Sequence, residues 1–222
     1  MSKPVPLKKP ASVTEIDLDT WERKHRFNMF RNVSNPHFGV TADIDITRLI
    51  ESYKPQGVST FNAVLYAIMK TVNSIPEFRT RFREDRIYQY AYSDPSYTIP
   101  IQDNGFAFCE TPYSANWKTF NEACLETSDQ AKRQTHVQEN ESSDHLTWLT
   151  CAPWVHFTAL AHASNGPDDC MPRLAWGKFT KRGDQWMMPV NVQAHHSLVD
   201  GYHAGLLINK TEEILQETDF SL

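Results

Sequence analysis

The sequence predicts an α/β domain of the mixed or α+β kind, with one large mixed β-sheet and flanking helices. Two observations indicate this class. Period-2 strand patterns are interspersed with segments of helical 3-to-4 spacing. In addition, the turn Lys181–Asp184 joins two strand patterns into a long β-hairpin. The 222 residues suffice for one core, so residues 1–222 are expected to form a single domain.

The chain begins with a Pro- and Lys-rich stretch, residues 1–15, which is expected to form a loose arm. Asp19 or Thr20 could then cap a short helix that contains Trp21 and Phe27.

A half-buried strand is predicted over residues 38–46, because apolar and polar side chains alternate there. A helix follows, capped by Ser59 or Thr60 and ended by Pro76. Its apolar residues recur at helical spacing: Phe61, Val64, Leu65, Ile68, Val72 and Ile75.

The middle of the chain predicts short strands near residues 87–92 and 97–101. An amphipathic helix is expected around Trp117 and Cys124. Residues 126–145 are polar apart from Val137, which favours a solvated face or a loop.

The last part of the chain predicts strands over 149–160 and 174–180, then a long strand from Trp186. If its alternation continues, His196 joins the apolar face and points into the interior, while His195 joins the opposite face. Asp200 is expected to cap a final helix over residues 201–216.

Composition excludes several function classes. The net charge of −5 and a pI of about 6.0 argue against general nucleic-acid binding. No run of about 18 apolar residues predicts a membrane span, and the start lacks the apolar core of a signal peptide. The four cysteines show no CxxC spacing, so reduced thiols in a cytoplasmic protein are expected. A zinc site or a disulfide framework is a minor alternative.

The heptapeptide His195–Gly201, HHSLVDG, resembles the HHxxxDG signature of CoA-dependent acyltransferases. The chain is most similar to the trimeric, type A chloramphenicol acetyltransferase family. Further segments match that family in the same order, namely Trp21-Glu22-Arg23, Ile44–Thr47, Pro76–Arg79, Pro153–Phe157 and Gly177–Phe179. The resemblance implies the CoA-dependent acyltransferase fold, a homotrimer with active sites at subunit interfaces, acetyl-CoA as co-substrate and no metal.

Direct acyl transfer needs a base for the acceptor proton and a donor for the developing oxyanion. A neutral imidazole suits the first task, and His196 is the expected base; a buried structural histidine is the alternative. The family places a serine hydroxyl where Thr150 stands, so Thr150 is the expected oxyanion donor, or simply a β-branched strand residue. The resemblance also implies an orienting ion pair between Asp200 and Arg23.

The resemblance maps the coenzyme onto Lys178, near the phosphates, and Phe179, stacked on adenine, with Trp154 beside them. Acceptor-site positions map onto Met29, Phe30, Phe106 (or Phe108), Leu160, His162, Arg173 and Ala175. His162 and Arg173 replace apolar family residues, and Ala175 replaces a threonine. A buried arginine needs an anionic or strongly accepting partner, so a pocket-lining Arg173 would disfavour chloramphenicol.

These observations predict an O-acetyltransferase that transfers acetyl from acetyl-CoA to chloramphenicol, a resistance activity, without a covalent enzyme intermediate. One alternative is a related acyltransferase with another hydroxyl or amine acceptor. Another is a non-catalytic binder of small molecules on the same fold. A metal enzyme with His196, Asp200 and His203 as ligands is weaker, because the strand-to-helix break separates them.

Overall fold

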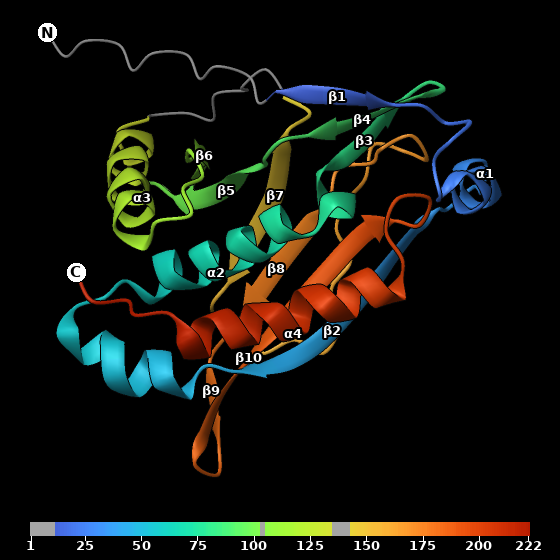
Figure 1. The fold of residues 1–222 in the computed structure, drawn as a ribbon. Helices are drawn as coiled ribbons and strands as arrows, with labels where there is room; N and C mark the ends of the chain where they lie inside the picture. The colour runs from blue at the N-terminus through green and yellow to red at the C-terminus, as the bar shows by residue number, and fades with distance from the viewer. Residues whose placement is uncertain (1–11, 103–104, 135–142) are drawn as a thin grey trace, which may run out of the picture.

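A seven-stranded mixed sheet forms the centre of the computed structural model, which describes residues 12–102, 105–134 and 143–222. Its strand order is β2-β10-β8-β7-β5-β6, with β9 paired to β10 (Figure 1). The strands are β2 His37–Asp45, β5 Asp94–Pro100, β6 Phe106–Glu110, β7 Leu146–Ala152, β8 Arg173–Gly177, β9 Thr180–Arg182 and β10 Gln185–His195. A smaller antiparallel sheet, β1-β4-β3, contains β1 Val13–Ile16, β3 Thr80–Arg83 and β4 Arg86–Tyr90.

Two helices lie side by side across one face of the large sheet, α2 Thr60–Ser74 and α4 Gly201–Glu217 (Figure 1). The others are α1 Lys24–Arg31 and α3 Trp117–Lys132, with the short helical turns η1 Leu49–Tyr53, η2 Lys54–Gln56 and η3 Pro76–Arg79. The core lies between these two helices and the sheet, where β10 contributes Met188, Val190, Val192 and Ala194, all at most 1% exposed.

Local sequence explains where the main elements begin. The Ser59 hydroxyl accepts the Asn62 N–H at the start of α2, and Asp200 accepts the Tyr202 N–H at the start of α4. The helix of residues 117–132 starts in the same way, with Asn116 accepting from Thr119 N–H. The predicted strand over 38–46 and the C-terminal hairpin are confirmed, because β10 pairs antiparallel with β8 and β9.

Several predicted boundaries were wrong. The strand expected to reach residue 160 ends at Ala152, because Pro153 follows and cannot donate to a strand ladder. Helix α1 begins after Arg23 rather than at a cap on Asp19 or Thr20. Residues 13–15, expected in a loose arm, belong to β1. Residues 1–11 of that arm, and 135–142 of the predicted polar loop with Val137, lie outside the described residues.

The face of the sheet opposite α2 and α4 is covered by the connection between β7 and β8, here called the β7–β8 loop, residues 153–172. Asn191 of β10 donates to Leu160 O of this loop at 3.1 Å, and the Gln193 amide bonds both the N–H and the C=O of His162. Both faces of β10 are therefore buried, which leaves its polar side chains under the loop.

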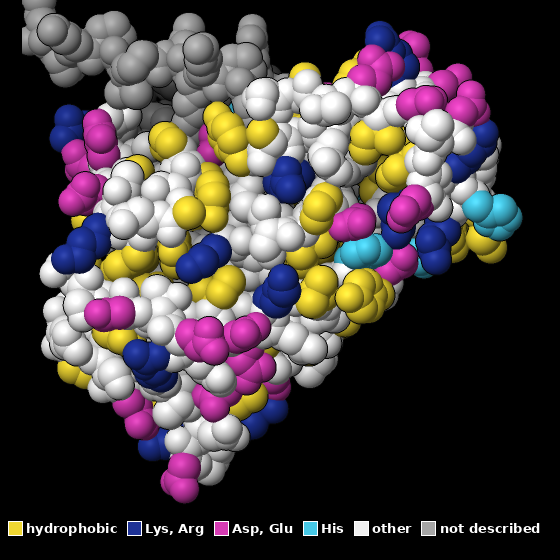
Figure 2. Space-filling view, viewed as in Figure 1, with side chains coloured by type: hydrophobic (Ala, Val, Ile, Leu, Met, Phe, Trp, Pro, Cys, Tyr) yellow, Lys and Arg dark blue, Asp and Glu magenta, His cyan; other side chains and the backbone are white. Residues whose placement is uncertain are grey.

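No helix of the described residues is long and apolar enough to cross a bilayer. On the surface that carries α2 and α4, Lys and Arg side chains are interspersed with Asp and Glu (Figure 2).

Candidate functional site

His196 lies just past the end of β10, where the chain turns toward α4. Its ring stacks on Phe30 of α1 with centroids 3.9 Å apart and planes at 1°, and it packs against Phe38 of β2 at 4.6 Å. Its backbone N–H donates to Pro36 O at 2.8 Å. Its Nδ1 atom is buried and has no hydrogen-bond partner among the described residues. Two aromatic rings therefore fix the imidazole, and the buried Nδ1 keeps no partner among the described residues.

His195 is the more deeply buried of the two histidines, although the sequence predicted only His196 to point toward the interior. His195 is 1% exposed, whereas His196 is half-buried. The reason is the β7–β8 loop, which covers the face of β10 that carries His195. His195 Nε2 donates to Pro167 O at 2.8 Å, and its Nδ1 accepts from the Ser197 hydroxyl at 2.7 Å. Burial lowers the pKa of His195 to about 4, so the ring is neutral near pH 7.

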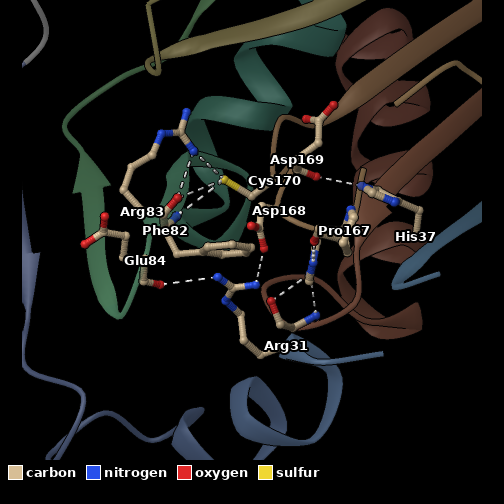
Figure 3. A network of polar contacts seen from close by, with 11 residues as sticks. Arg31, His37, Phe82, Arg83, Glu84, Pro167, Asp168, Asp169 and Cys170 are labelled. Atoms are coloured by element: carbon tan, nitrogen blue, oxygen red, sulfur yellow. Dashed lines mark hydrogen bonds and ion pairs between the residues drawn. The ribbon is translucent and has the colours of Figure 1, made fainter. Parts of the chain in front are cut away.

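Further contacts hold the β7–β8 loop against the end of β10 (Figure 3). Arg31 of α1 pairs with Asp168 at 2.5 Å, and His37 of β2 donates to Asp169 O at 2.6 Å. Beside them, the Cys170 thiol sulfur accepts from Arg83 at 3.3 Å. Sequence reasoning missed this network, whose members come from α1, β2, β3 and the loop.

The expected ion pair between Arg23 and Asp200 is present. Arg23 Nη1 lies 3.2 Å from Asp200 Oδ2, and the arginine is 8% exposed. Burial raises the pKa of the Asp200 carboxyl, but the Arg23 hydrogen bond and the His203 charge outweigh it, so the pKa is lowered. The pair joins the start of α1 to the start of α4, directly after the turn that holds His196.

A cavity of about 630 Å³ lies beside β7 on the face opposite the main helices. It is large enough for a small molecule. Its walls include three predicted site residues, Thr150, His162 and Arg173, together with Phe108 and Trp148. Burial lowers the pKa of His162, and the nearby Arg173 charge lowers it further, so this ring is also neutral near pH 7.

Arg173 already has an anionic partner within the chain. Its Nη2 lies 2.5 Å from Asp169 Oδ2, its Nη1 donates to Met171 O at 3.1 Å, and its guanidinium lies 4.6 Å from the Trp148 ring centre. Both charged side chains are nearly fully buried. A buried arginine was expected to need an anionic partner, and Asp169, four residues earlier, supplies it within the chain.

A second cavity, of about 380 Å³, lies at the start of α2. Lys178 and Phe179 line it, together with Phe61, Cys151 and Pro153. Burial raises the pKa of the Cys151 thiol to about 12, so this thiol stays protonated. Trp154, which the family resemblance placed at the coenzyme site with Lys178 and Phe179, is 78% exposed. The cavity is lined by one cationic side chain, Lys178, and by the aromatic residues Phe61, Trp176 and Phe179.

Comparisons with known proteins show the family to which this chain belongs. The family model described as "CAT: Chloramphenicol acetyltransferase" matches residues 11–212. The chain belongs to the chloramphenicol acetyltransferase family. It is 31% identical over 209 residues to a chloramphenicol acetyltransferase of Staphylococcus aureus, covering 90% of this chain and 94% of that protein.

Two further comparisons agree with the chloramphenicol acetyltransferase assignment. Chloramphenicol acetyltransferase 2 of Escherichia coli is 30% identical over 200 residues, covering 88% of this chain and 93% of that protein. A solved structure described as a chloramphenicol acetyltransferase superposes with a TM-score of 0.82 at 27% identity, covering 92% of this chain and all of that one. The large mixed sheet with flanking helices is thus the fold of this family.

The remaining residues predicted for the acceptor site lie in different places. Phe106 is 46% exposed at the start of β6, whereas Phe108 lines the 630 Å³ cavity, so the alternative register fits that cavity better. Leu160 lines a neighbouring cavity of about 490 Å³, which also includes His162. Ala175 is fully buried in β8 and Met29 is 63% exposed on α1.

Thr150 and His196 are far apart within one chloramphenicol acetyltransferase chain. Thr150 pairs with Ala175, which pairs with Asn191, so Thr150 lies two strands away from β10. His196 follows Asn191 by five positions. Strand spacing and rise then put the two Cα atoms roughly 19 Å apart. From these positions within a single subunit, the two side chains cannot both reach the reacting carbon of one bound molecule.

Sequence reasoning also missed the roles of Glu77 and His203. His203 Nδ1 lies 2.8 Å from Asp200 Oδ1, and its Nε2 lies 3.4 Å from Glu77 Oε1. The motif offered a signal, because His203 stands three positions after Asp200, at the helix position that reaches back to the cap. Within the described residues, no group of three or more His, Cys, Asp or Glu side chains is arranged to hold a metal ion.

Proposed function

We propose that this protein is an acetyl-CoA-dependent O-acetyltransferase that acetylates a hydroxyl of chloramphenicol. The observation that carries the proposal is the family match over residues 11–212. The Arg23–Asp200 ion pair beside His196 and the small-molecule cavity at Thr150 support it. We propose further that residues 1–222 form one domain, that the protein is cytoplasmic, and that its activity confers resistance.

In the proposed reaction, a neutral His196 ring nitrogen takes the proton from the acceptor hydroxyl. The hydroxyl oxygen forms a bond to the thioester carbonyl carbon while the Thr150 hydroxyl donates to the carbonyl oxygen as it gains charge. The carbon–sulfur bond then breaks, and the imidazolium returns its proton to the departing thiolate. The products are the acetyl ester and free CoA thiol, so no bond to the enzyme forms.

The cavity at the start of α2 is the proposed coenzyme site. Lys178 supplies a positive charge for phosphate, and Phe179 an aromatic face for adenine. The N-terminus of α2 borders the same cavity through Thr60, and helix N-termini favour anions. The residues present therefore fit a nucleotide-bearing thioester.

We propose that the active site is completed between subunits of a homotrimer. Thr150 and His196 of one chain are roughly 19 Å apart by strand geometry, yet the reaction needs both at one carbonyl group. A neighbouring subunit that brings its His196 to the Thr150 cavity would satisfy that need. The exposed Met29 on α1, near Phe30, would then contact the acceptor from the same neighbour.

The residues that line the cavity at Thr150 support chloramphenicol as the substrate more strongly than the sequence suggested. Because Asp169 neutralises Arg173, the wall carries no unpaired cation at that position. Phe108 and Trp148 supply aromatic surface for a nitrophenyl ring.

The proposal is tested by measuring release of CoA thiol from acetyl-CoA on addition of chloramphenicol. Wild-type protein should release thiol in proportion to the drug acetylated. His196→Ala should lower kcat by a factor of about 10² to 10⁴, because it removes the base.

The matched control is His25→Ala, which removes an exposed histidine of α1 and should leave kcat unchanged. A panel of other hydroxyl and amine acceptors is run in parallel. Turnover of another acceptor but not of the drug would reassign the substrate, and drug binding without any turnover would favour a non-catalytic binder.

A further inference from the structure

Residues 155–157 of the β7–β8 loop lie directly against the segment that carries the proposed coenzyme residues. The Lys178 N–H donates to Val155 O at 2.9 Å. The two segments are so close at Gly177 that a Cβ there would lie 2.7 Å from Val155 O and 2.9 Å from Phe157 Cε1. The loop is therefore in tight contact with the chain immediately before and at Lys178.

His156, which lies between these two loop residues, faces the other backbone polar group of Lys178. Its Nδ1 is 3.2 Å from Lys178 O and 3.0 Å from Thr180 Oγ1. A carbonyl oxygen can only accept, so Nδ1 carries the proton and donates it toward these two oxygens. The N–H and the C=O of Lys178 are therefore held by two consecutive residues of the loop.

The other side of the His156 ring is held by β9 and β2. Arg182 Nη2 donates to Nε2 at 2.8 Å, and Arg182 Nη1 lies 2.5 Å from Asp43 Oδ2. Because Nδ1 donates while Nε2 accepts, one neutral ring satisfies all of these hydrogen bonds. Asp43 Oδ1 also lies 3.0 Å from Nε2. A second proton on Nε2 would point to that carboxylate and would leave the Nδ1 bond to Lys178 O in place.

These contacts act on the coenzyme cavity from outside it. Lys178 and Phe179 line the 380 Å³ cavity, whereas His156 does not. The His156 side chain is 15% exposed, so its hydrogen bonds are largely shielded from water. Lys178 is exposed, and its ammonium stands on a flexible four-carbon stem. The bonds to its backbone therefore set the position from which the ammonium reaches a ligand.

We propose that His156 is a positioning residue for the coenzyme. Through Lys178 O and Thr180 it fixes the segment that presents Lys178 to the nucleotide phosphates and Phe179 to adenine, and it touches neither substrate itself. This role rests on the proposed function, while binding of coenzyme A can be measured without turnover.

The decisive variant is His156→Leu, which keeps a side chain of similar size and removes both ring nitrogens. We expect the Kd for coenzyme A and the KM for acetyl-CoA to rise about 10-fold, because the segment loses its hydrogen bonds. The acceptor KM and kcat should stay within about twofold, because only coenzyme binding is loosened. If leucine lowers the melting temperature, His156→Gln takes its place with the same expected loss, since its amide lies one carbon beyond the position of Nδ1.

Two further variants separate positioning from a general structural effect. His156→Asn places a side-chain N–H where Nδ1 stands, so it should restore the Kd to within about threefold of wild type. His25→Leu makes the same histidine-to-leucine change on the exposed side of α1 and should leave the Kd unchanged. Combined with Lys178→Ala, His156→Leu should weaken binding by less than the product of the two single effects, because His156 acts partly through Lys178.

Titration calorimetry with coenzyme A measures these constants, and equal melting temperatures confirm that the variants are folded. A wild-type Kd in His156→Leu would overturn the proposal, and so would an equal loss in His156→Asn and His156→Leu. If the wild-type protein binds coenzyme A but acetylates no acceptor, the proposed function fails and the order of the Kd values still decides the role of His156. If the wild-type protein does not bind coenzyme A, both proposals are wrong.

Discussion

The two adjacent histidines of the motif differ because of what covers each ring. His195 is enclosed by the β7–β8 loop and keeps both ring nitrogens occupied, through Pro167 O and Ser197. The His196 ring stacks on Phe30, and its buried Nδ1 has no hydrogen-bond partner among the described residues. A ring whose two nitrogens both hold hydrogen bonds within the protein is not free to exchange a proton with a substrate, so the geometry marks His195 as a structural histidine.

Acid should destabilise the protein through His195. The folded state lowers its pKa from 6.5 to about 4, so the unfolded chain binds a proton first as pH falls. Stability contributed by neutral His195 is complete above pH 6.5 and is lost between 6.5 and 4. The free energy of unfolding should fall by up to about 1.4 kcal/mol per pH unit in that window.

Urea unfolding at several pH values measures this slope. His195→Gln keeps a donor for Pro167 O but cannot titrate, so its unfolding free energy should depend less on pH between 6.5 and 4. An equal slope in both proteins would contradict the assignment.

At the scale of elements, β10 organises the site because it is paired on both sides and covered on both faces. Its register with β2 runs from Met187 to His195, and β8 lies on its other side. Asn191 and Gln193 anchor the β7–β8 loop, and His195 anchors it again at Pro167. One strand therefore positions both the β7–β8 loop, which lines part of the 630 Å³ cavity, and the turn that holds His196.

The start of α2 offers a test at this scale. Ser59 caps the helix by accepting the Asn62 N–H. Ser59→Ala should lower the free energy of unfolding by about 1 kcal/mol, because an N-terminal N–H loses its partner. Ser59→Asp keeps an acceptor and should retain wild-type stability in the same denaturant titration. Equal loss in both variants would show that the cap bond is not the cause.

At the scale of the whole molecule, the chain separates the predicted base from the predicted oxyanion donor. His196 lies at the end of β10 beside α1, and Thr150 lines a cavity two strands away. This separation is the physical reason to propose an assembly in which each site combines surfaces of two subunits.

Mixed assemblies test that proposal directly. His196→Ala and Thr150→Ala chains should each have low activity alone. When they are unfolded together and refolded, one interface in four combines an intact Thr150 with an intact His196. Activity should then recover to about one quarter of the wild-type value in a closed ring. Chains refolded separately and then mixed are the control, and no recovery after joint refolding would place the whole site within one subunit.

The sequence by itself determined the features that depend on near neighbours. Alternation over 38–46 and along β10, the caps at Ser59 and Asp200, and the hairpin at Lys181–Asp184 were all predicted, because each is decided within a few residues. The family motif added the Arg23–Asp200 pairing, which local patterns cannot predict.

Only the tertiary structure decided which histidine is buried, how Arg173 is neutralised, and that Glu77 and His203 join Asp200. The β7–β8 loop folds back over β10, and no strand alternation contains that information. The contacts that join Glu77 and His203 to Asp200 likewise bring together residues from helix ends far apart in sequence. Burial and charge pairing depend on what the rest of the chain places around a residue, which is why these features appeared only in three dimensions.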